Sequence, residues 1–508
     1  MRRTLAVVAC VVTLLGLAPA AFAQAPAPKV TIVGLFDQVT SGGRNIYDGN
    51  FARSSESEWY ARTRFRPDFT FEVGRTKAVL GLEIDLMYGQ AGANDGGFPT
   101  NNSGTNQGCK AGTNGCLDIN TDVGGMIEIK WIYTEFDLTG KDSLLPFIPV
   151  GTVARVGGQP FATLANYKIA YANGDFAGIS TRTTFAPNLS MALAYVQVED
   201  EPAGSNRLLR TATAGRRGND FAVIVSPEIT PFKGLDIKPL YSYFYAEGST
   251  SGSARRTVNN QQGAVAPTEE HRHTVGVDAR WRSGPFSLDP TVYYQFGDRQ
   301  QRGVGDADVS AWFVDIQGGW QLGPLLLEGR GVYTTGNKAS NDLRNGTLRY
   351  YEPLDLDTGY WTGWSNIQAL GVDYFNGGGG TMGGLPTNVG YDRYGRMGFG
   401  VRATYSLTPQ LAFYAIASPT WTEEKVDTDT NSTGGPRSAP VAATNGGDSR
   451  YLGTEADIGL TWRFAPNTVF DLVGAYMFAG PALDTADASG TRDAKNGWTV
   501  AARVRLSF

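Results

Sequence analysis

Apolar and polar residues alternate in short segments along most of this chain. From Ala78 to Tyr88 every even position is apolar, while Glu83 and Asp85 stand at odd positions. From Gly497 to Phe508 every even position is again apolar. A period of two places successive side chains on opposite faces of a β-strand, so each segment predicts a strand with one apolar and one polar face.

The segment that begins at Ile127 follows the same rule. Its polar positions are Glu128, Lys130 and Thr134. We therefore expect a lipid-type face formed by Ile127, Ile129, Trp131 and Tyr133. Further segments of this kind bring the expected strands to 29–38, 57–71, 77–89, 124–137, 150–158, 174–185, 189–199, 218–229, 235–247, 271–282, 286–297, 308–321, 325–335, 396–407, 410–421, 451–464, 468–479 and 497–508.

Short and long connections occur in turn between these strands. Pro, Gly and Asn mark short turns, as at Ala186–Asn188 and Ser283–Pro285, because these residues supply the backbone angles of tight turns. Long polar segments separate the resulting hairpins, at 39–56, 90–123, 200–217, 248–270, 336–395, 422–450 and 480–496. Short periplasmic turns and long extracellular loops are typical of barrels in the bacterial outer membrane. We expect an all-β fold, a transmembrane antiparallel β-barrel of about eighteen strands.

The composition agrees with this fold. The chain has 65 Gly, 23 Tyr, 25 Phe and 10 Trp but only 7 Met, which suits strands and turns. No stretch after the N-terminus is apolar enough for a membrane helix, because each apolar run is soon interrupted by Gly, Pro or a charge. A soluble β-sandwich or propeller is the alternative, and it would bury the aromatic residues that here stand near segment ends.

The N-terminus has the form of a secretory signal. Arg2 and Arg3 precede an apolar run that ends at Leu17, and Ala21-Phe22-Ala23 forms a cleavage pattern. We expect a signal peptide at 1–23 and the barrel at 24–508. The apolar run is shorter than the roughly 20 residues of a membrane-spanning helix. Cleavage would remove both arginines and change the net charge from −5 to −7, which argues against a nucleic-acid partner.

Candidate metal and disulfide sites are few. Cys109 and Cys116 lie in one polar segment, and an oxidising compartment favours a disulfide between them. Asp118, Asn120 and Asp122 could supply oxygen ligands to calcium, but solvated loop residues are the simpler interpretation because the rest of the calcium-loop pattern is missing. We expect no cofactor and no metal site.

The two histidines are the remaining candidates for metal binding or catalysis. His271 and His273 fall on the expected lipid-facing side of a strand, at the rim, where an interfacial role is favoured over metal binding. No Gly-x-Ser-x-Gly stretch stands out and these are the only histidines, so a Ser-His pair inside the barrel is difficult to place. We expect a protein that is not an enzyme.

Arginines dominate the charges on the polar faces. If these faces line a lumen, the guanidinium groups would attract anions through it. The triplet Arg62, Arg64 and Arg66 would place three charges within about 14 Å on one strand. The candidate pore-lining residues are Arg62, Arg64, Arg66, Arg155, Arg182, Arg272, Arg280, Arg282, Arg330, Arg402, Arg463, Arg503 and Arg505.

The same arginines could instead form ion pairs across neighbouring strands and simply neutralise the wall. For any single arginine this structural role is the favoured interpretation, and the triplet is the exception. The candidate partners are Glu83, Asp85, Glu128, Asp278, Glu328, Glu455, Asp457 and Asp471.

The signal-like N-terminus, the alternating hairpins and a last strand that ends in Phe508 together resemble the Gram-negative porins. In that group a terminal aromatic residue is similar to the signal that the barrel-assembly machinery reads, so the resemblance implies this role for Phe508. Residues 152–161 are similar to the strand-to-loop passage of these porins. Residues 343–351 and 371–375 resemble the alginate-export family, which implies a passive conduit for an anionic polysaccharide.

These observations predict a porin of the outer membrane for passive diffusion of hydrophilic, mainly anionic, solutes. The expected partners are outer-membrane lipids, the barrel-assembly machinery and the solutes themselves. An exporter of an alginate-like polysaccharide and a barrel that sheathes a partner protein are the alternatives. Segment 336–395 is the expected constriction or lid, since long loops in compact proteins are usually functional or disordered.

Overall fold

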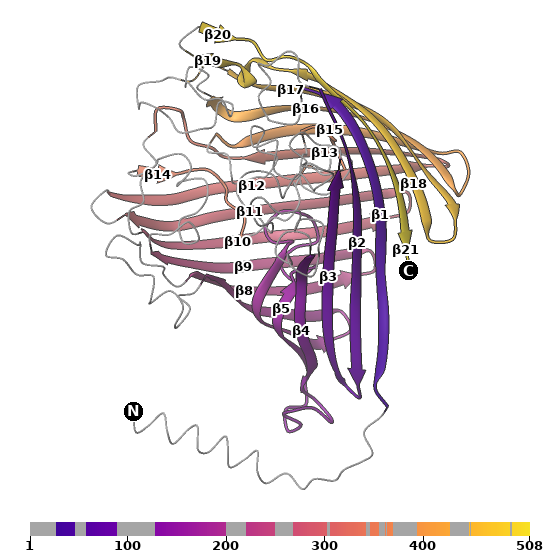
Figure 1. The fold of residues 1–508 in the computed structure, drawn as a ribbon. Coiled ribbons are helices and arrows are strands. Elements are labelled where there is room, and N and C mark those ends of the chain that lie inside the picture. Colours follow the sequence, from indigo (N-terminus) through magenta and orange to yellow (C-terminus); the bar gives the residue numbers. More distant parts are fainter. Residues whose placement is uncertain are drawn as a thin grey trace, which may run out of the picture.

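The computed structural model describes residues 27–45, 57–88, 127–199, 220–248, 268–301, 305–341, 346–354, 361, 363–368, 394–426, 447, 449–487 and 490–508. Eighteen long strands form the wall of one barrel (Figure 1). They are β1 (Lys29–Arg44), β2 (Ser57–Val73), β3 (Thr76–Tyr88), β4 (Ile127–Thr139), β5 (Gly151–Pro160), β6 (Asp175–Ala186), β7 (Leu189–Glu199), β8 (Asp220–Phe232), β9 (Leu235–Gly248), β10 (Thr268–Ser283), β11 (Phe286–Gln301), β12 (Gly305–Leu322), β13 (Leu325–Thr334), β15 (Arg396–Ser406), β16 (Leu411–Val426), β17 (Ser449–Ala465), β18 (Thr468–Ala479) and β21 (Gly497–Ser507).

The sheet closes on itself. Each wall strand pairs antiparallel with the wall strands before and after it, and β1 pairs with β2 on one edge and with β21 on the other. The closing seam runs from Leu35 opposite Ser507 to Arg44 opposite Trp498. Closure leaves no unpaired edge among the described strands of the wall, as a membrane environment requires. The predicted fold, an antiparallel barrel of about eighteen strands, is confirmed.

Three short strands lie outside the wall. The strand β14 (Gly346–Leu348) pairs parallel with β12, while β19 (Thr485–Asp487) and β20 (Gly490–Arg492) pair with each other. A 3-10 helix, η3 (Pro481–Leu483), precedes β19. Within the described residues, no helix is long and apolar enough to cross a membrane.

The short turns all lie at the barrel end where β1 begins and β21 ends. Two residues connect β2 to β3, β10 to β11, β12 to β13 and β17 to β18. A residue with positive φ stands in each of these turns: Gly74, Gly284, Gly323 and Asn467. Gly and Asn tolerate this left-handed conformation, and the predicted turn at Ser283–Pro285 is confirmed.

The two faces of the wall follow the alternation of the sequence over most strands. In the last strand Trp498, Val500, Val504 and Leu506 are exposed on the outer face, while Arg503 and Arg505 point inward to carboxylates of β18 and β1. Apolar side chains on the outer face and ion pairs on the inner face are the arrangement expected of a barrel with a wet lumen.

Strand β4 departs from the predicted arrangement. Its pairing with β3 shifts between Gly81 and Leu82, which leaves one extra residue, Lys130, on β4. Such a bulge exchanges the two faces of a strand. Trp131 and Tyr133 therefore lie on the inner face, where Arg66 and Arg155 each stand 5.0 Å from a ring centroid. The prediction of one continuous apolar face through Ile129, Trp131 and Tyr133 is wrong beyond the bulge.

Candidate functional site: the barrel lumen

The loop of residues 161–174, here the inner loop, enters the lumen. It connects β5 and β6, which have 10 and 12 residues, whereas β10 to β12 have 16 to 18. Because β5 and β6 are short, their connection starts part-way down the wall rather than at its rim. A backbone hydrogen bond of 2.9 Å from Phe161 N to Gly174 O closes the loop at its base.

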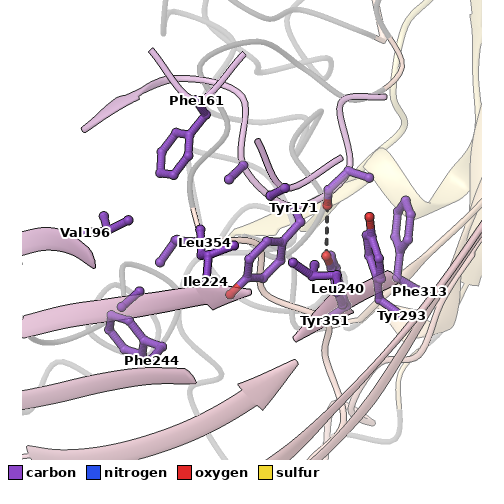
Figure 2. Close-up of a cluster of buried hydrophobic side chains, with 14 of the residues drawn as sticks. Phe161, Tyr171, Val196, Ile224, Leu240, Phe244, Tyr293, Phe313, Tyr351 and Leu354 are labelled. Carbon is purple, nitrogen blue, oxygen red and sulfur yellow. Dashed lines mark hydrogen bonds between the residues drawn. The ribbon is translucent and has the colours of Figure 1, made fainter. Parts of the chain in front are cut away.

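Apolar side chains hold the inner loop against the wall of the barrel. Figure 2 shows Phe161 and Tyr171 of the loop facing residues of neighbouring strands, among them Ile224 of β8 and Phe244 of β9. The hydroxyl of Tyr351 also donates a hydrogen bond of 2.9 Å to the carbonyl of Ala170. The members of the cluster are buried, so a packed apolar layer covers this part of the inner wall.

Polar contacts fix the far side of the inner loop. The backbone N–H of Tyr167 donates to Asp278 Oδ2 at 2.6 Å. The ammonium of Lys168 donates to the carbonyl of Asp289 at 2.6 Å and lies 3.5 Å from the carboxylate of Asp315. Burial lowers the pKa of Lys168, and the carboxylates of Asp315 and Asp278 oppose that shift. The loop therefore reaches from β5 to β10, β11 and β12.

A second segment, residues 346–354, packs beside the inner loop. Its Glu352 lies between Arg272 and Arg299, at 3.1 and 3.7 Å. Glu270 pairs with the same two arginines at 2.7 and 2.6 Å. All four side chains are essentially inaccessible to solvent. A buried network of two acids and two guanidinium groups is electrically balanced, which makes its burial tolerable.

A third segment, residues 361–368, binds to a wall carboxylate. Glu455 of β17 accepts hydrogen bonds from the backbone N–H groups of Asn366, Ile367 and Gln368 at 2.6 to 2.8 Å, and from the hydroxyl of Ser365 at 2.5 Å. Successive backbone N–H groups form a concave anion-binding site, which here holds a carboxylate of the protein itself.

Two tryptophans of this segment lie on a glycine strip of β15. A Cβ at Gly398 would meet Trp361 at 3.3 Å, and one at Gly400 would meet Trp364 at 2.7 Å. Trp361 and Trp364 are both buried. The described residues of 346–354 and 361–368, which belong to the expected constriction, thus pack inside the lumen. The sequence did not predict the inner loop, because residues 159–173 contain no long polar run.

Eleven of the thirteen candidate arginines form ion pairs with carboxylates. Most of the N···O distances are 2.6 to 3.1 Å, as in charge-assisted hydrogen bonds. Arg66 and Arg280 stand 3.6 Å from their carboxylates and form ion pairs without a hydrogen bond. The pairs are Arg64 and Arg66 with Glu83, Arg155 with Glu135, Arg182 with Glu228, Arg272 with Glu270 and Glu352, Arg280 with Asp236, Arg282 with Asp289, Arg330 with Asp315, Arg402 with Glu328, Arg503 with Asp471 and Arg505 with Asp37.

The solvent reaches the two partners of these pairs unequally. The side chain of Arg182 is 47% exposed and that of Glu228 is 22% exposed. For Arg282 and Asp289 the values are 52% and 12%, and Arg66, Arg155, Arg402 and Arg505 show the same order. The pairs of Lys130 and Lys238 show the opposite order. Most exposed wall pairs therefore present the guanidinium to a solute and keep the carboxylate behind it.

Some candidates do not meet the lumen or lie outside the described residues. Arg64, Arg272 and Arg330 are buried, so a solute cannot reach them in this arrangement, and Arg463 is exposed at the end of β17. The side chains of Arg62, Asp85 and Glu128 lie outside the described part of the structure, as do Cys109, Cys116, Asp118, Asn120, Asp122 and residues 1–26.

Not every expected carboxylate partner binds an arginine. Glu83, Glu328 and Asp471 do, whereas Asp278, Glu455 and Asp457 bind residues of the loops inside the lumen. His271 and His273 lie on the outer face beside Tyr243. In the described ranges no group of three or more His, Cys, Asp or Glu side chains could hold a metal ion.

A cavity of about 350 Å³ opens between the base of the inner loop and the wall. Arg155 and Arg182 line it together with Glu135, and Phe161 and Leu164 add apolar surface. A volume of this size accommodates a small molecule. The cavity combines two partly exposed guanidinium groups with an apolar floor.

The outer surface places the barrel in a membrane. Exposed aromatic rings gather toward the short-turn end, including Phe71, Phe185, Trp320 and Phe464, and toward the long-loop end, including Tyr195, Tyr476, Phe478 and Trp498. Two aromatic girdles around an apolar band are the signature of bacterial outer-membrane barrels, which have an even number of strands in one chain. The protein is a barrel of the bacterial outer membrane.

Comparison with known proteins gives structural neighbours but no sequence relatives. No family model matches the chain, and no curated protein matches its sequence. The chain is similar to OccAB4 of Acinetobacter baumannii, at 10% identity over 96% of this chain and 99% of that one, with a TM-score of 0.49. It is similar to the outer membrane protein OpdK of Pseudomonas aeruginosa, at 10% identity over 94% and 99%, with a TM-score of 0.48.

A third neighbour is OccK5 (OpdH) of Pseudomonas aeruginosa, at 9% identity over 94% of this chain and 98% of that one, with a TM-score of 0.47. The comparison gives no support to the resemblance with the alginate-export family that residues 343–351 and 371–375 indicated.

Proposed function

We propose that the protein is an outer-membrane channel for small hydrophilic solutes, with a preference for anions. The observation that carries the proposal is the unequal exposure within the wall ion pairs. Arg66, Arg155, Arg182, Arg282, Arg402 and Arg505 are each more than twice as exposed as their carboxylate partners. A solute close to the wall therefore approaches positive charge first, and the planar guanidinium group pairs well with carboxylate or phosphate.

The loops inside the lumen support the size range of the solute. The inner loop and residues 346–354 cover the wall from β6 to β13 with packed side chains, so they narrow the space that remains. A solute must then pass near the walls, where fixed charges act over distances shorter than the Debye length of about 8 Å at physiological salt. The cavity beside Arg155 and Arg182 has the volume of a small solute.

Reversal potentials across a salt gradient test the proposal. We expect the purified protein in planar bilayers to conduct and to favour chloride over potassium. The triple variant Arg66→Gln, Arg155→Gln, Arg182→Gln leaves Glu83, Glu135 and Glu228 without these partners and should move the reversal potential toward cation preference. Lys29→Gln is a single-charge control at the end of the barrel, where the side chain of Lys29 is 70% exposed, and it should leave the reversal potential nearly unchanged.

The alternatives give different results in the same experiment. Cation preference of the unmodified protein would contradict the anion proposal. An exporter of an anionic polysaccharide would be blocked by added alginate at concentrations at which a monomeric uronate has no effect. A barrel that sheathes a partner protein would show little conductance when it is isolated with the partner bound and would conduct only after the partner is removed.

A further inference from the structure

The connection between β4 and β5 differs from the other turns at its end of the barrel. It comprises residues 140–150, whereas most turns at this end have two residues. Figure 1 shows it projecting beyond the lower end of β4. Its tip exposes large apolar side chains, with Phe147 at 78%, Leu144 at 58% and Ile148 at 36%. We call residues 144–150 the apolar turn.

Backbone hydrogen bonds within the apolar turn and to the end of β4 hold it in place. Leu144 N and Leu145 N donate to the carbonyls of Asp137 and Leu138 at 3.1 and 2.8 Å, and Ile148 N donates to Leu145 O at 3.2 Å. Pro146 and Pro149 have no N–H. Of its seven backbone nitrogens, two donate to β4, one donates within the turn and two have no hydrogen to donate. This reduces the free-energy cost of moving the turn from water into the membrane interface.

The apolar turn also continues the barrel wall. Residues 144 and 145 run beside Asp137–Thr139 of β4, and a parallel bridge joins Thr139 and Leu145. The other edge of β4 is occupied by β5, so the turn takes the edge that β3 leaves free before its first residue, Thr76. It thus lies at the rim of the barrel, at the short-turn end.

The neighbouring turn between β2 and β3 fixes this position. Arg75 pairs with Asp137 at 2.9 Å and donates to the carbonyl of Lys141 at 2.6 Å. The last residues of β2 expose Phe71 and Val73, at 46% and 45%, on the same outer face as the rings of the girdle. The apolar turn therefore extends an apolar surface that already faces lipid.

We propose that the apolar turn inserts into the interfacial region of the periplasmic leaflet and anchors this sector of the barrel to the lipid. The occupant of its surface is lipid because the surface is continuous with the lipid-facing belt, and residues 143–150 contain no charged side chain. Lys141 and Asp142 precede the apolar turn in the same connection, and both are exposed. These charged residues mark the side of the connection that faces water. Aromatic and aliphatic side chains at this depth favour the interface over water.

Spin labels in vesicles test the proposal. In a Cys109→Ser, Cys116→Ser background, Phe147→Cys carries a nitroxide, and the protein is reconstituted in phosphatidylethanolamine–phosphatidylglycerol vesicles without other proteins. We expect the nitroxide to collide with oxygen and to collide several-fold less often with a water-soluble nickel chelate than a label at Lys141→Cys on the same turn. Leu144→Cys provides a second labelled site with the same expectation, in case Phe147→Cys does not fold.

The opposite outcomes are equally clear. Nickel accessibility at residues 147 and 144 equal to that at residue 141 would show that the turn stands in water and would overturn the proposal. Dipolar broadening that disappears when labelled protein is diluted with unlabelled protein would show that a second copy, not lipid, covers the turn, and would overturn it as well.

Discussion

Arg505 in the last strand binds Asp37 in the first strand through two hydrogen bonds, one of them 2.6 Å from Nε to Oδ1. The pair bridges the seam at which the barrel closes, and the side chain of Asp37 is only 2% exposed. Arg505 opposes Asp37 directly in the strand register. The two ends of the chain are thus joined by an ion pair in addition to the backbone ladder.

Breaking this pair should weaken the barrel. Asp37→Ala leaves the guanidinium of Arg505 without its buried partner, and hydrogen bonds to charged groups contribute about 1.5–3 kcal/mol each. We expect a loss of stability in this range, measured as a lower urea concentration for unfolding of the detergent-solubilised barrel. Lys29→Ala removes the exposed pair with Glu72 and should change stability by less than about 1 kcal/mol. An equal effect of both variants would contradict the special role of the seam.

A side chain at Gly400 should expel a loop from the lumen. Gly400→Val places atoms where Trp364 now lies, since even a Cβ would come within 2.7 Å of its ring. We expect residues 361–368 to leave the wall and the single-channel conductance to increase. Gly329→Val serves as control, because a Cβ there meets its nearest atom only at 3.9 Å. Unchanged conductance in Gly400→Val would show that this segment does not limit the current.

A substitution of the buried acid Glu352 should weaken the attachment of residues 346–354 to the barrel wall. Glu352→Gln removes one of the two negative charges that balance Arg272 and Arg299. Breaking a buried pair costs about 3–5 kcal/mol of stability. Here the lost interaction is the one that attaches residues 346–354 to the wall. We expect faster proteolysis near residues 346–354 and greater current noise in bilayers. Glu424→Gln, which removes a partner of the exposed Arg450, should change neither measurement.

The terminal residue Phe508 should matter for assembly. Its backbone exchanges hydrogen bonds of 2.9 and 3.0 Å with Gly34, and its ring lies 6.2 Å from the rings of Phe36 and Phe65. Deletion of Phe508 removes both contacts at the seam. We expect less folded protein in the outer membrane, measured by the heat-modifiable band on gels, and partial recovery with Phe508→Tyr. Phe464→Leu, on the same face at another strand end, should assemble normally.

The alternation of the sequence predicted the wall because side chains in a strand have only two directions. It could not predict the bulge at Lys130, since a single inserted residue has no mark in composition yet moves Trp131 and Tyr133 to the inner face. The inner loop was missed for a related reason. Tyr167 and Lys168 stand in an ordinary mixed segment, and their contacts with Asp278 and Asp315 come from strands more than 100 residues away.

For the arginines too, the sequence predicted one property and not another. Their inward direction follows from alternation, as for Arg503 and Arg505, but their exposure depends on whether a loop covers them. Arg272 and Arg182 are alike in the sequence, each on a polar face, yet Arg272 lies under Glu352 and Arg182 faces open solvent. The sequence alone could not separate a solute-facing arginine from a buried one.

Six partly exposed guanidinium groups in the described part of the lumen each have a less exposed carboxylate partner. An anion that arrives at Arg182 meets a cation already satisfied by Glu228, so it gains only part of the attraction that an isolated arginine would offer. Permeation requires a ligand to be attracted enough to enter and held weakly enough to leave. If the channel prefers anions as proposed, we expect the carboxylate beside each guanidinium group to shorten the time that an anion stays bound there, so that anions leave the site quickly.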